Sequence, residues 1–192
     1  AVSSDASITA FAEQWVAQLK AQGCKMEHST QTQRGAVSFS GGTGVGENLA
    51  WAWGQTLSWT QIVNMWWGEI SDYSYGPSSN ACTQRGVVGH FTQAAWECSI
   101  KIGCARASCS DGSEVASCNY GAQGNFMGRL PFSGTVAAAL GLSSTPCASG
   151  GSACTSRRRR RNECPTTPPS VATVITSAPT YAPTAATTPA PA

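Results

Sequence analysis

Residues 89–96 read Gly-His-Phe-Thr-Gln-Ala-Ala-Trp and include His90, one of only two histidines in the chain. The apolar members of this stretch predict a short helix that starts at His90: Phe91, Ala94, Ala95 and Trp96. The other histidine, His28, lies in Gly-Cys-Lys-Met-Glu-His-Ser at 23–29. The two histidines therefore sit in separate segments that the fold has to bring together if they act jointly.

Two carboxylates lie between the histidines in the sequence. Glu47 belongs to Gly-Glu-Asn-Leu-Ala-Trp (46–51), which we interpret as a glycine-rich turn, and Glu69 follows Met-Trp-Trp-Gly. Two imidazoles and two carboxylates can form either a hydrated metal site or an acid–base cluster. The alternative is structural: histidines bonded to backbone, Glu47 bonding amides of its turn, and Glu69 paired with a loop donor.

Two longer segments carry apolar residues at helical spacing. The first is 5–22, with Asp5 as its N-cap and Gly23 at its end. The second is 58–72, which Ser-x-x-Gln opens as a capping box. Its predicted apolar stripe is Ile62, Met65, Trp66 and Ile70. Glu69 falls on or beside that stripe, so its carboxylate needs a partner.

Two strands are predicted at 99–108 and 114–120, because Ser-Asp-Gly between them is a hairpin signal. Helices and hairpin together predict one domain of mixed α and β structure. The segment 71–89 has no periodicity and is predicted to be a loop. It carries three candidate ligand-binding residues: Tyr73, Tyr75 and Pro77. Aromatic side chains with polar tips suit a flat amphipathic ligand, although an irregular surface loop explains them equally well.

The composition divides the chain near residue 146. All seven tryptophans precede that point, and residues 1–146 hold seven Lys/Arg against nine Asp/Glu, a net charge of −2. A mildly acidic domain without a basic face argues against nucleic acid as a partner. Residues 147–165 contain the run Arg157–Arg161, which fits a proprotein-convertase-type cleavage site or an exposed linker, with an anionic cell surface as the alternative partner. Residues 166–192 are rich in Thr, Pro and Ala, as in a disordered, O-glycosylated tail.

Nine cysteines in a chain of low charge predict a disulfide framework formed in an oxidising compartment, and hence a secreted protein. The Cys-x-x-Cys spacing of a metal cluster does not occur in the sequence. Because nine is odd, at least one thiol is free or intermolecular.

Five segments resemble, in order, the signature blocks of the CAP superfamily, which comprises cysteine-rich secretory proteins, antigen 5 and pathogenesis-related 1 proteins. The segments are Cys-Lys-Met-Glu-His-Ser (24–29), Gly-Glu-Asn-Leu-Ala-Trp (46–51), Gly-His-Phe-Thr-Gln-Ala-Ala-Trp (89–96), Ile-Gly-Cys-Ala-Arg-Ala-Ser-Cys (102–109) and Cys-Asn-Tyr-Gly-Ala-Gln-Gly-Asn-Phe-Met-Gly (118–128). The resemblance implies an α+β fold, a three-layer α-β-α sandwich, and a central cleft lined by His28, Glu47, Glu69 and His90. It further implies that the two histidines bind zinc or magnesium weakly and that the carboxylates act through water.

The resemblance also implies disulfides. Two of them map to Cys24–Cys109 and Cys104–Cys118. Plant members have a cysteine where this chain has Val88, so Cys82 loses its usual partner and Cys98 is the substitute. Three cysteines remain outside the domain: Cys147, Cys154 and Cys164. Family members carry a segment before the first helix, so we also expect this chain to lack an N-terminal piece.

Together these observations predict a CAP domain over 1–146, a linker over 147–165 and a disordered tail over 166–192. The predicted function is the binding of an extracellular lipid, a sterol or fatty acid, with a role in defence or host interaction. One alternative is an extracellular hydrolase that uses a metal or Ser29 beside His28, although no Gly-x-Ser-x-Gly or His-Glu-x-x-His motif supports it. The other is a non-catalytic scaffold whose loops bind protein partners or a membrane surface.

Overall fold

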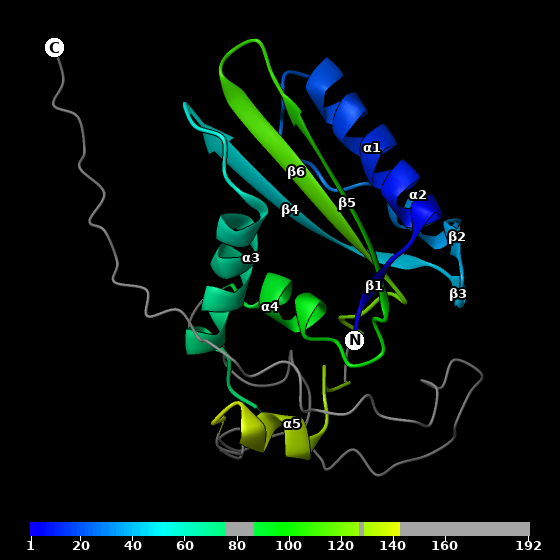
Figure 1. The fold of residues 1–192 in the computed structure, drawn as a ribbon, viewed down its shortest axis with the longest axis vertical. Helices are drawn as coiled ribbons and strands as arrows, with labels where there is room; N and C mark the ends of the chain where they lie inside the picture. The colour runs from blue at the N-terminus through cyan, green and yellow to red at the C-terminus, as the bar shows by residue number, and fades with distance from the viewer. Residues whose placement is uncertain (76–86, 127–128, 143–192) are drawn as a thin grey trace, which may run out of the picture.

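A computed structural model describes residues 1–75, 87–126 and 129–142. Its centre is a four-stranded sheet in the order β1-β5-β6-β4 (Figure 1). The strands are β1 (Ser3–Ser4), β4 (Val45–Trp53), β5 (Lys101–Ser108) and β6 (Ser113–Gly121). β1 runs parallel to β5, whereas β5–β6 and β6–β4 are antiparallel. A small second sheet pairs β2 (Ser38–Phe39) with β3 (Gly42–Thr43).

Helices cover both faces of the large sheet (Figure 1). On one face α1 (Ala6–Ala21) packs against β5 and β6. On the other lie α3 (Trp59–Gly68), the 3₁₀ helix η1 (Glu69–Asp72) and α4 (Gly89–Ala94). Two shorter helices complete the set: α2 (Gln31–Gly35) and α5 (Gly134–Ala139). The predicted three-layer α-β-α sandwich is therefore confirmed.

Alternate residues of β4 pack against the two helical layers. Leu49 packs with Trp15 of α1, while Ala50 and Ala52 pack with Trp66 of α3. Both faces of the strand are thus buried over much of its length. β4 lies at one edge of the sheet and carries contacts to both layers.

The helix starts agree with the capping signals in the sequence. The Asp5 carboxylate accepts hydrogen bonds from the amides of Ser7 and Ile8, at 3.0 and 3.3 Å. At α3 the Ser58 and Gln61 side chains form the predicted capping box. α3 ends at Gly68, however, and the four residues that follow tighten into η1.

Two local predictions were wrong. Met65 was expected on the buried stripe of α3, but it is 51% exposed, because the residues of α3 that are fully buried are Ile62 and Trp66. Residues 46–51 were interpreted as a turn, yet they belong to the nine-residue strand β4. Hydrogen bonding to β6 along the whole of β4 overrides the local preference of its glycine and asparagine.

Both disulfides expected within the described part of the chain are present: Cys24–Cys109 and Cys104–Cys118. Cys98 is disulfide-bonded. Its predicted partner Cys82 lies outside the described residues, as do Pro77, the three later cysteines and the predicted linker and tail. Within the described ranges, every helix is too short or too polar to cross a membrane.

Candidate functional site

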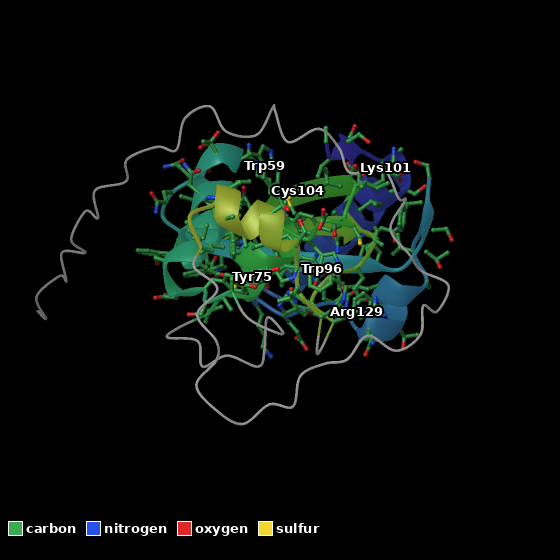
Figure 2. All side chains as sticks on the ribbon, turned by 90° about the horizontal axis from the view of Figure 1, so that it is seen from below. Trp59, Tyr75, Trp96, Lys101, Cys104 and Arg129 are labelled. Atoms are coloured by element: carbon green, nitrogen blue, oxygen red, sulfur yellow. A yellow bond between two sulfur atoms is a disulfide. The ribbon has the colours of Figure 1, made fainter. Side chains whose placement is uncertain are left out.

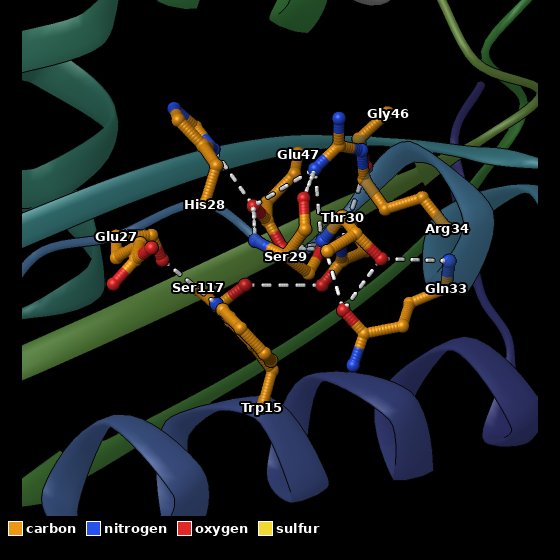
Figure 3. Close-up of polar contacts among 11 residues, drawn as sticks. Trp15, Glu27, His28, Ser29, Thr30, Gln33, Arg34, Gly46, Glu47 and Ser117 are labelled. Carbon is orange, nitrogen blue, oxygen red and sulfur yellow. Dashed lines mark hydrogen bonds and ion pairs between the residues drawn. The ribbon is translucent and has the colours of Figure 1, made fainter. Parts of the chain in front are cut away.

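The first histidine–carboxylate pair joins the loop after α1 to the sheet edge (Figure 3). His28 Nδ1 lies 2.7 Å from Glu47 Oε1. The Glu47 side chain is only 1% exposed, whereas that of His28 is 57% exposed. A buried carboxylate on β4 therefore anchors an imidazole whose far side faces solvent.

Several further donors surround the Glu47 carboxylate. The Ser29 amide donates to Oε1 at 3.0 Å and the Ser29 hydroxyl to Oε2 at 2.7 Å. Asn119 Nδ2 donates to Oε2 at 3.4 Å, and Arg34 Nη1 lies 3.6 Å from Oε1. Burial alone would raise the pKa of Glu47, but the hydrogen bonds from His28 and Ser29 outweigh it and hold that pKa below its ordinary value. Glu47 is therefore a carboxylate anion at neutral pH.

Ser29 belongs to the support of this carboxylate. It is 2% exposed, and its hydroxyl donates to Glu47. Arg34 Nη1 donates to both the carbonyl and the hydroxyl oxygen of Ser29. A serine nucleophile needs its hydroxyl proton directed at a base nitrogen, and here the proton is directed at a carboxylate behind the imidazole.

The second pair joins the end of α3 to the start of α4. Glu69 Oε1 lies 2.6 Å from His90 Nδ1, and Oε2 accepts the amides of His90 and Phe91, each at 3.0 Å. The carboxylate thus satisfies two of the free N–H groups in the first turn of α4. The His90 ring also stacks on Trp66, with ring centroids 6.0 Å apart and planes inclined by 15°.

The two pairs share one chemical consequence. An ionised carboxylate accepts hydrogen bonds only, so each Nδ1 carries the proton that it shares with its glutamate. In the neutral form of each imidazole, Nε2 is then the nitrogen that keeps its lone pair. Each oxygen of the two carboxylates accepts at least one hydrogen bond from the protein, and one of these bonds in each pair orients the imidazole.

β4 connects the two pairs through a residue that the sequence prediction missed. Asn48 follows Glu47, is 1% exposed, and donates from Nδ2 to the His90 carbonyl at 3.0 Å and to the Tyr120 hydroxyl at 3.3 Å. On the other side of Glu47, Gly46 lies under α4, where a Cβ atom would stand 1.9 Å from Gln93 Oε1. Residues 46–48 therefore hold His28 through Glu47 and hold α4 directly.

The four predicted residues are arranged two by two. Across the described residues, no three His, Cys, Asp or Glu side chains form a group suited to holding a metal ion. Each histidine is instead coupled to one glutamate, and the link between the pairs is Asn48. A metal at this place would take imidazole nitrogen from the protein and most of its other ligands from water.

The predicted ligand loop is less open than expected. Tyr73 is 5% exposed and packs against Phe91 and Phe132, with ring centroids 5.3 and 5.9 Å away. Of the buried side-chain polar atoms in the described part of the chain, only the Tyr73 hydroxyl is without a hydrogen-bond partner. Burial, and to a smaller extent neighbouring Tyr75, raises the pKa of Tyr73 to about 12. The phenol is therefore a neutral donor that is left unused.

Tyr75 completes this aromatic cluster at the base of α5. Its ring stacks on Phe132 at 5.7 Å, and its hydroxyl donates to the Phe132 carbonyl at 3.3 Å. Figure 2 shows Tyr75 beside α5, and a Cβ on Gly134 would meet the Tyr75 hydroxyl at 3.7 Å. Tyr73 is thus buried and Tyr75 partly buried, and residues of α5 pack on the cluster that they form.

Comparison with known proteins places the chain in a family. The model of "Cysteine-rich secretory protein family", CAP, matches residues 1–120. A "Pathogenesis-related protein PR-1 type" of Sambucus nigra is 39% identical over 131 residues, which cover 68% of this chain and 70% of that protein. "Pathogenesis-related protein 1C" of Nicotiana tabacum is 37% identical over 128 residues, 67% of each chain.

A solved structure is similar to this chain in fold. The "Crystal structure of NaASP2 with Zn2+" superposes with a TM-score of 0.53 at 25% sequence identity. The match covers 68% of this chain and 65% of that one. The family model, the plant relatives and the shared architecture lead to one conclusion: this chain belongs to the cysteine-rich secretory protein family, CAP.

Proposed function

We propose that this chain is an extracellular, defence-related CAP protein that binds a sterol or fatty acid against the aromatic cluster of Tyr73, Tyr75, Phe91 and Phe132. The observation that carries the proposal is the Tyr73 hydroxyl, which is buried without a partner. Leaving such a group unpaired costs about 1–3 kcal/mol. A ligand with an apolar body and one oxygen atom would bury its body among the rings and accept that hydrogen bond.

The helix that covers the aromatic cluster, α5, is short. α5 has six residues, and Ala137 packs on the cluster together with Val136 and Leu140. A helix of this length has little stability of its own. Displacing it is therefore the least costly way for a ligand to reach Tyr73.

The defence role and the location rest on the relatives. Two similar plant proteins are named pathogenesis-related. Disulfides such as Cys24–Cys109 and Cys104–Cys118 form mainly in oxidising compartments, which supports secretion.

The test is retention of cholesterol and of palmitate by purified protein, measured by native mass spectrometry and by titration. Tyr73→Phe keeps the ring and removes the hydroxyl, so we expect affinity to fall about tenfold while the protein stays as stable or becomes more stable. Tyr120→Phe is the matched control, because Tyr120 is also buried but already bonds Asn48. Full retention by Tyr73→Phe, or equal loss in both variants, would refute the proposal.

A weak zinc site is the second proposed function, and the two oriented histidines favour it. Imidazole nitrogen suits zinc, whereas magnesium prefers oxygen ligands. The carboxylates behind His28 and His90 provide the orienting hydrogen bonds that metal-binding histidines commonly have. A structural relative was solved with Zn2+, which agrees with this choice of metal. Bound zinc would supply a positive charge and a Lewis acid at the protein surface.

Calorimetry distinguishes zinc binding from its alternatives. We expect a zinc signal and no magnesium signal from the wild-type protein, and loss of the zinc signal in His28→Ala/His90→Ala. Lys25→Ala is the control, because Lys25 is an exposed residue close to His28 in sequence. A zinc signal unchanged in the double variant would place the metal elsewhere in the chain. The geometry of Ser29 gives the hydrolase alternative no comparable support.

A further inference from the structure

Two tryptophans on β4 form an exposed aromatic surface that neither proposed function uses. Trp51 is 45% exposed and Trp53 is 67% exposed. They lie two residues apart on one strand, so their side chains project from the same face of the sheet. We call them the tryptophan pair.

The tryptophan pair is exposed because the covering layer ends before it. Leu49, two residues earlier on the same face, is buried against Trp15 and Leu19 of α1. α1 packs on β5 and β6, and the end of β4 stands apart from it (Figure 1). The apolar face of the sheet therefore continues past the core into solvent.

The polar group of Trp53 is already used. Its Nε1 donates to the Asp111 carbonyl in the β5–β6 turn at 3.1 Å. This bond fixes the indole relative to the hairpin, so the part of Trp53 that can bind a ligand is the face of its ring. A ligand for such a surface is one that stacks on an aromatic face.

The segments that flank the tryptophan pair are polar, and their charges are of both signs. Gln55 and Thr56 are exposed two and three residues after Trp53, and exposed Ser110 precedes Asp111, whose carbonyl Trp53 contacts. The Asp111 carboxylate is occupied by the amide and hydroxyl of Ser113, at 2.9 and 2.6 Å. Arg106 lies on the α3 face, where it donates to the Leu57 carbonyl and pairs with Glu114. On the α1 face, Lys20 and Lys25 lie close in sequence to Cys24, which is bonded to Cys109 of the hairpin, and Lys25 pairs with Glu27. Cations near the hairpin are thus few and mixed with carboxylates, unlike the run of four or more basic residues that attracts an anionic membrane.

The size of the surface also limits its partner. Two partly exposed indoles present a few hundred Å² at most, against about 800 Å² that each partner buries in a stable protein interface. A sugar chain fits better, because each ring has an apolar face for stacking and hydroxyl groups for side chains such as Gln55 and Thr56. Side chains two apart on a strand are about 6.6 Å apart, so the two indoles can contact successive rings.

We propose that the tryptophan pair is a binding platform for a neutral oligosaccharide. Glu47 lies four residues before Trp51, about 13 Å along the strand, so the platform is separate from the histidine–carboxylate pairs. The proposal does not depend on the lipid or zinc proposals.

The test is titration of the protein with cellohexaose, laminarihexaose and chitohexaose, followed by calorimetry and by saturation-transfer NMR. We expect binding of at least one hexasaccharide, an affinity about tenfold lower in Trp53→Ala, and no measurable binding in Trp51→Ala/Trp53→Ala. Met65→Ala is the matched control, because Met65 is a comparably exposed apolar residue on α3. Tyr73→Phe and His28→Ala/His90→Ala are expected to keep oligosaccharide binding.

Three results would overturn the proposal. One is a folded wild-type protein that binds none of the three hexasaccharides. Another is full binding by Trp51→Ala/Trp53→Ala with unchanged circular dichroism. The third is a double variant whose only loss is binding to phosphatidylcholine–phosphatidylglycerol vesicles or self-association in sedimentation, which would identify a membrane or a second copy as the partner.

Discussion

Glu47 is held by donors from three separate segments: the loop with His28 and Ser29, Arg34 of α2, and Asn119 of β6. A carboxylate that is buried and ionised has to be compensated in this way. Because the donors come from distant parts of the sequence, one side chain fixes the loop, the short helix and the sheet relative to one another. Changing it should affect stability as well as the orientation of His28.

Glu47→Gln keeps the shape and removes the charge, so we expect the free energy of unfolding at neutral pH to fall by about 1–3 kcal/mol. The folded pKa of Glu47 lies below its ordinary value of 4.5. The ionised carboxylate therefore contributes stability above the unfolded pKa, and this contribution is lost as the pH falls through the folded pKa. The difference between wild type and variant should be full near about pH 7 and shrink below about pH 4.5.

Urea unfolding at a series of pH values measures that difference. Glu13→Gln is the control, because Glu13 is exposed on α1. A gap between wild type and Glu47→Gln that stays constant down to about pH 3 would show that the Glu47 charge does not stabilise the fold.

The sequence supported a histidine–glutamate site at the level of residue types, but it could not pair the residues. The partner of each histidine depends on which loop crosses which strand, and local patterns do not contain that information. Asn48 links the two pairs because it follows Glu47 on β4, so that the two side chains point to opposite faces of the strand. This link was missed from the sequence because no strand was predicted there. Tyr73 was expected in an open loop, since burial beneath α5 is a tertiary contact.

Among the elements, those with strong local signals were predictable. α1 and α3 have apolar spacing and side-chain caps, and the β5–β6 hairpin has its Asp-Gly turn. β4 was not predictable in this way. Both of its faces are buried near Leu49 and Ala50, so the alternation of apolar and polar residues that marks a half-buried strand is lost. α2 and α5, of five and six residues, bury no residue and one residue respectively, so they lack the apolar pattern that made the equally short α4 predictable.

The contact between α1 and β5 depends on a glycine. A Cβ atom on Gly103 would lie 2.2 Å from the Thr9 backbone nitrogen, and backbone in a helix cannot move aside cheaply. Gly103→Ala should therefore push α1 away from the sheet and lower the free energy of unfolding by about 1–3 kcal/mol or more. Thermal and urea unfolding measure the loss.

Gly68→Ala provides the control for that experiment, since a Cβ at Gly68 would meet no atom within 4 Å. It is expected to be neutral or slightly stabilising, because alanine favours helix more than glycine does. If Gly103→Ala were as stable as Gly68→Ala, the close approach of α1 and β5 would not be a constraint on this fold.

At the scale of the whole molecule, the disulfides Cys24–Cys109 and Cys104–Cys118 stabilise different parts of the fold. Cys24–Cys109 joins the loop after α1 to the hairpin end, across 85 residues of sequence. Cys104–Cys118 links β5 and β6, which are already paired as neighbours, across 14 residues. The first therefore holds one helical layer to the sheet, and the second reinforces a pairing that the hairpin makes by itself.

This difference predicts unequal losses on removal. Closing a longer loop in the unfolded chain costs more entropy, so removing Cys24–Cys109 should destabilise the protein by about 1.6 kcal/mol more than removing Cys104–Cys118. The comparison uses Cys24→Ala/Cys109→Ala and Cys104→Ala/Cys118→Ala, each measured by urea unfolding with the other disulfide intact. Because Cys24 and Cys118 are both almost fully buried, the two variants lose similar packing. Equal losses, or a larger loss from Cys104–Cys118, would mean that packing around the β5–β6 bridge outweighs the long-range tether of α1 to the sheet.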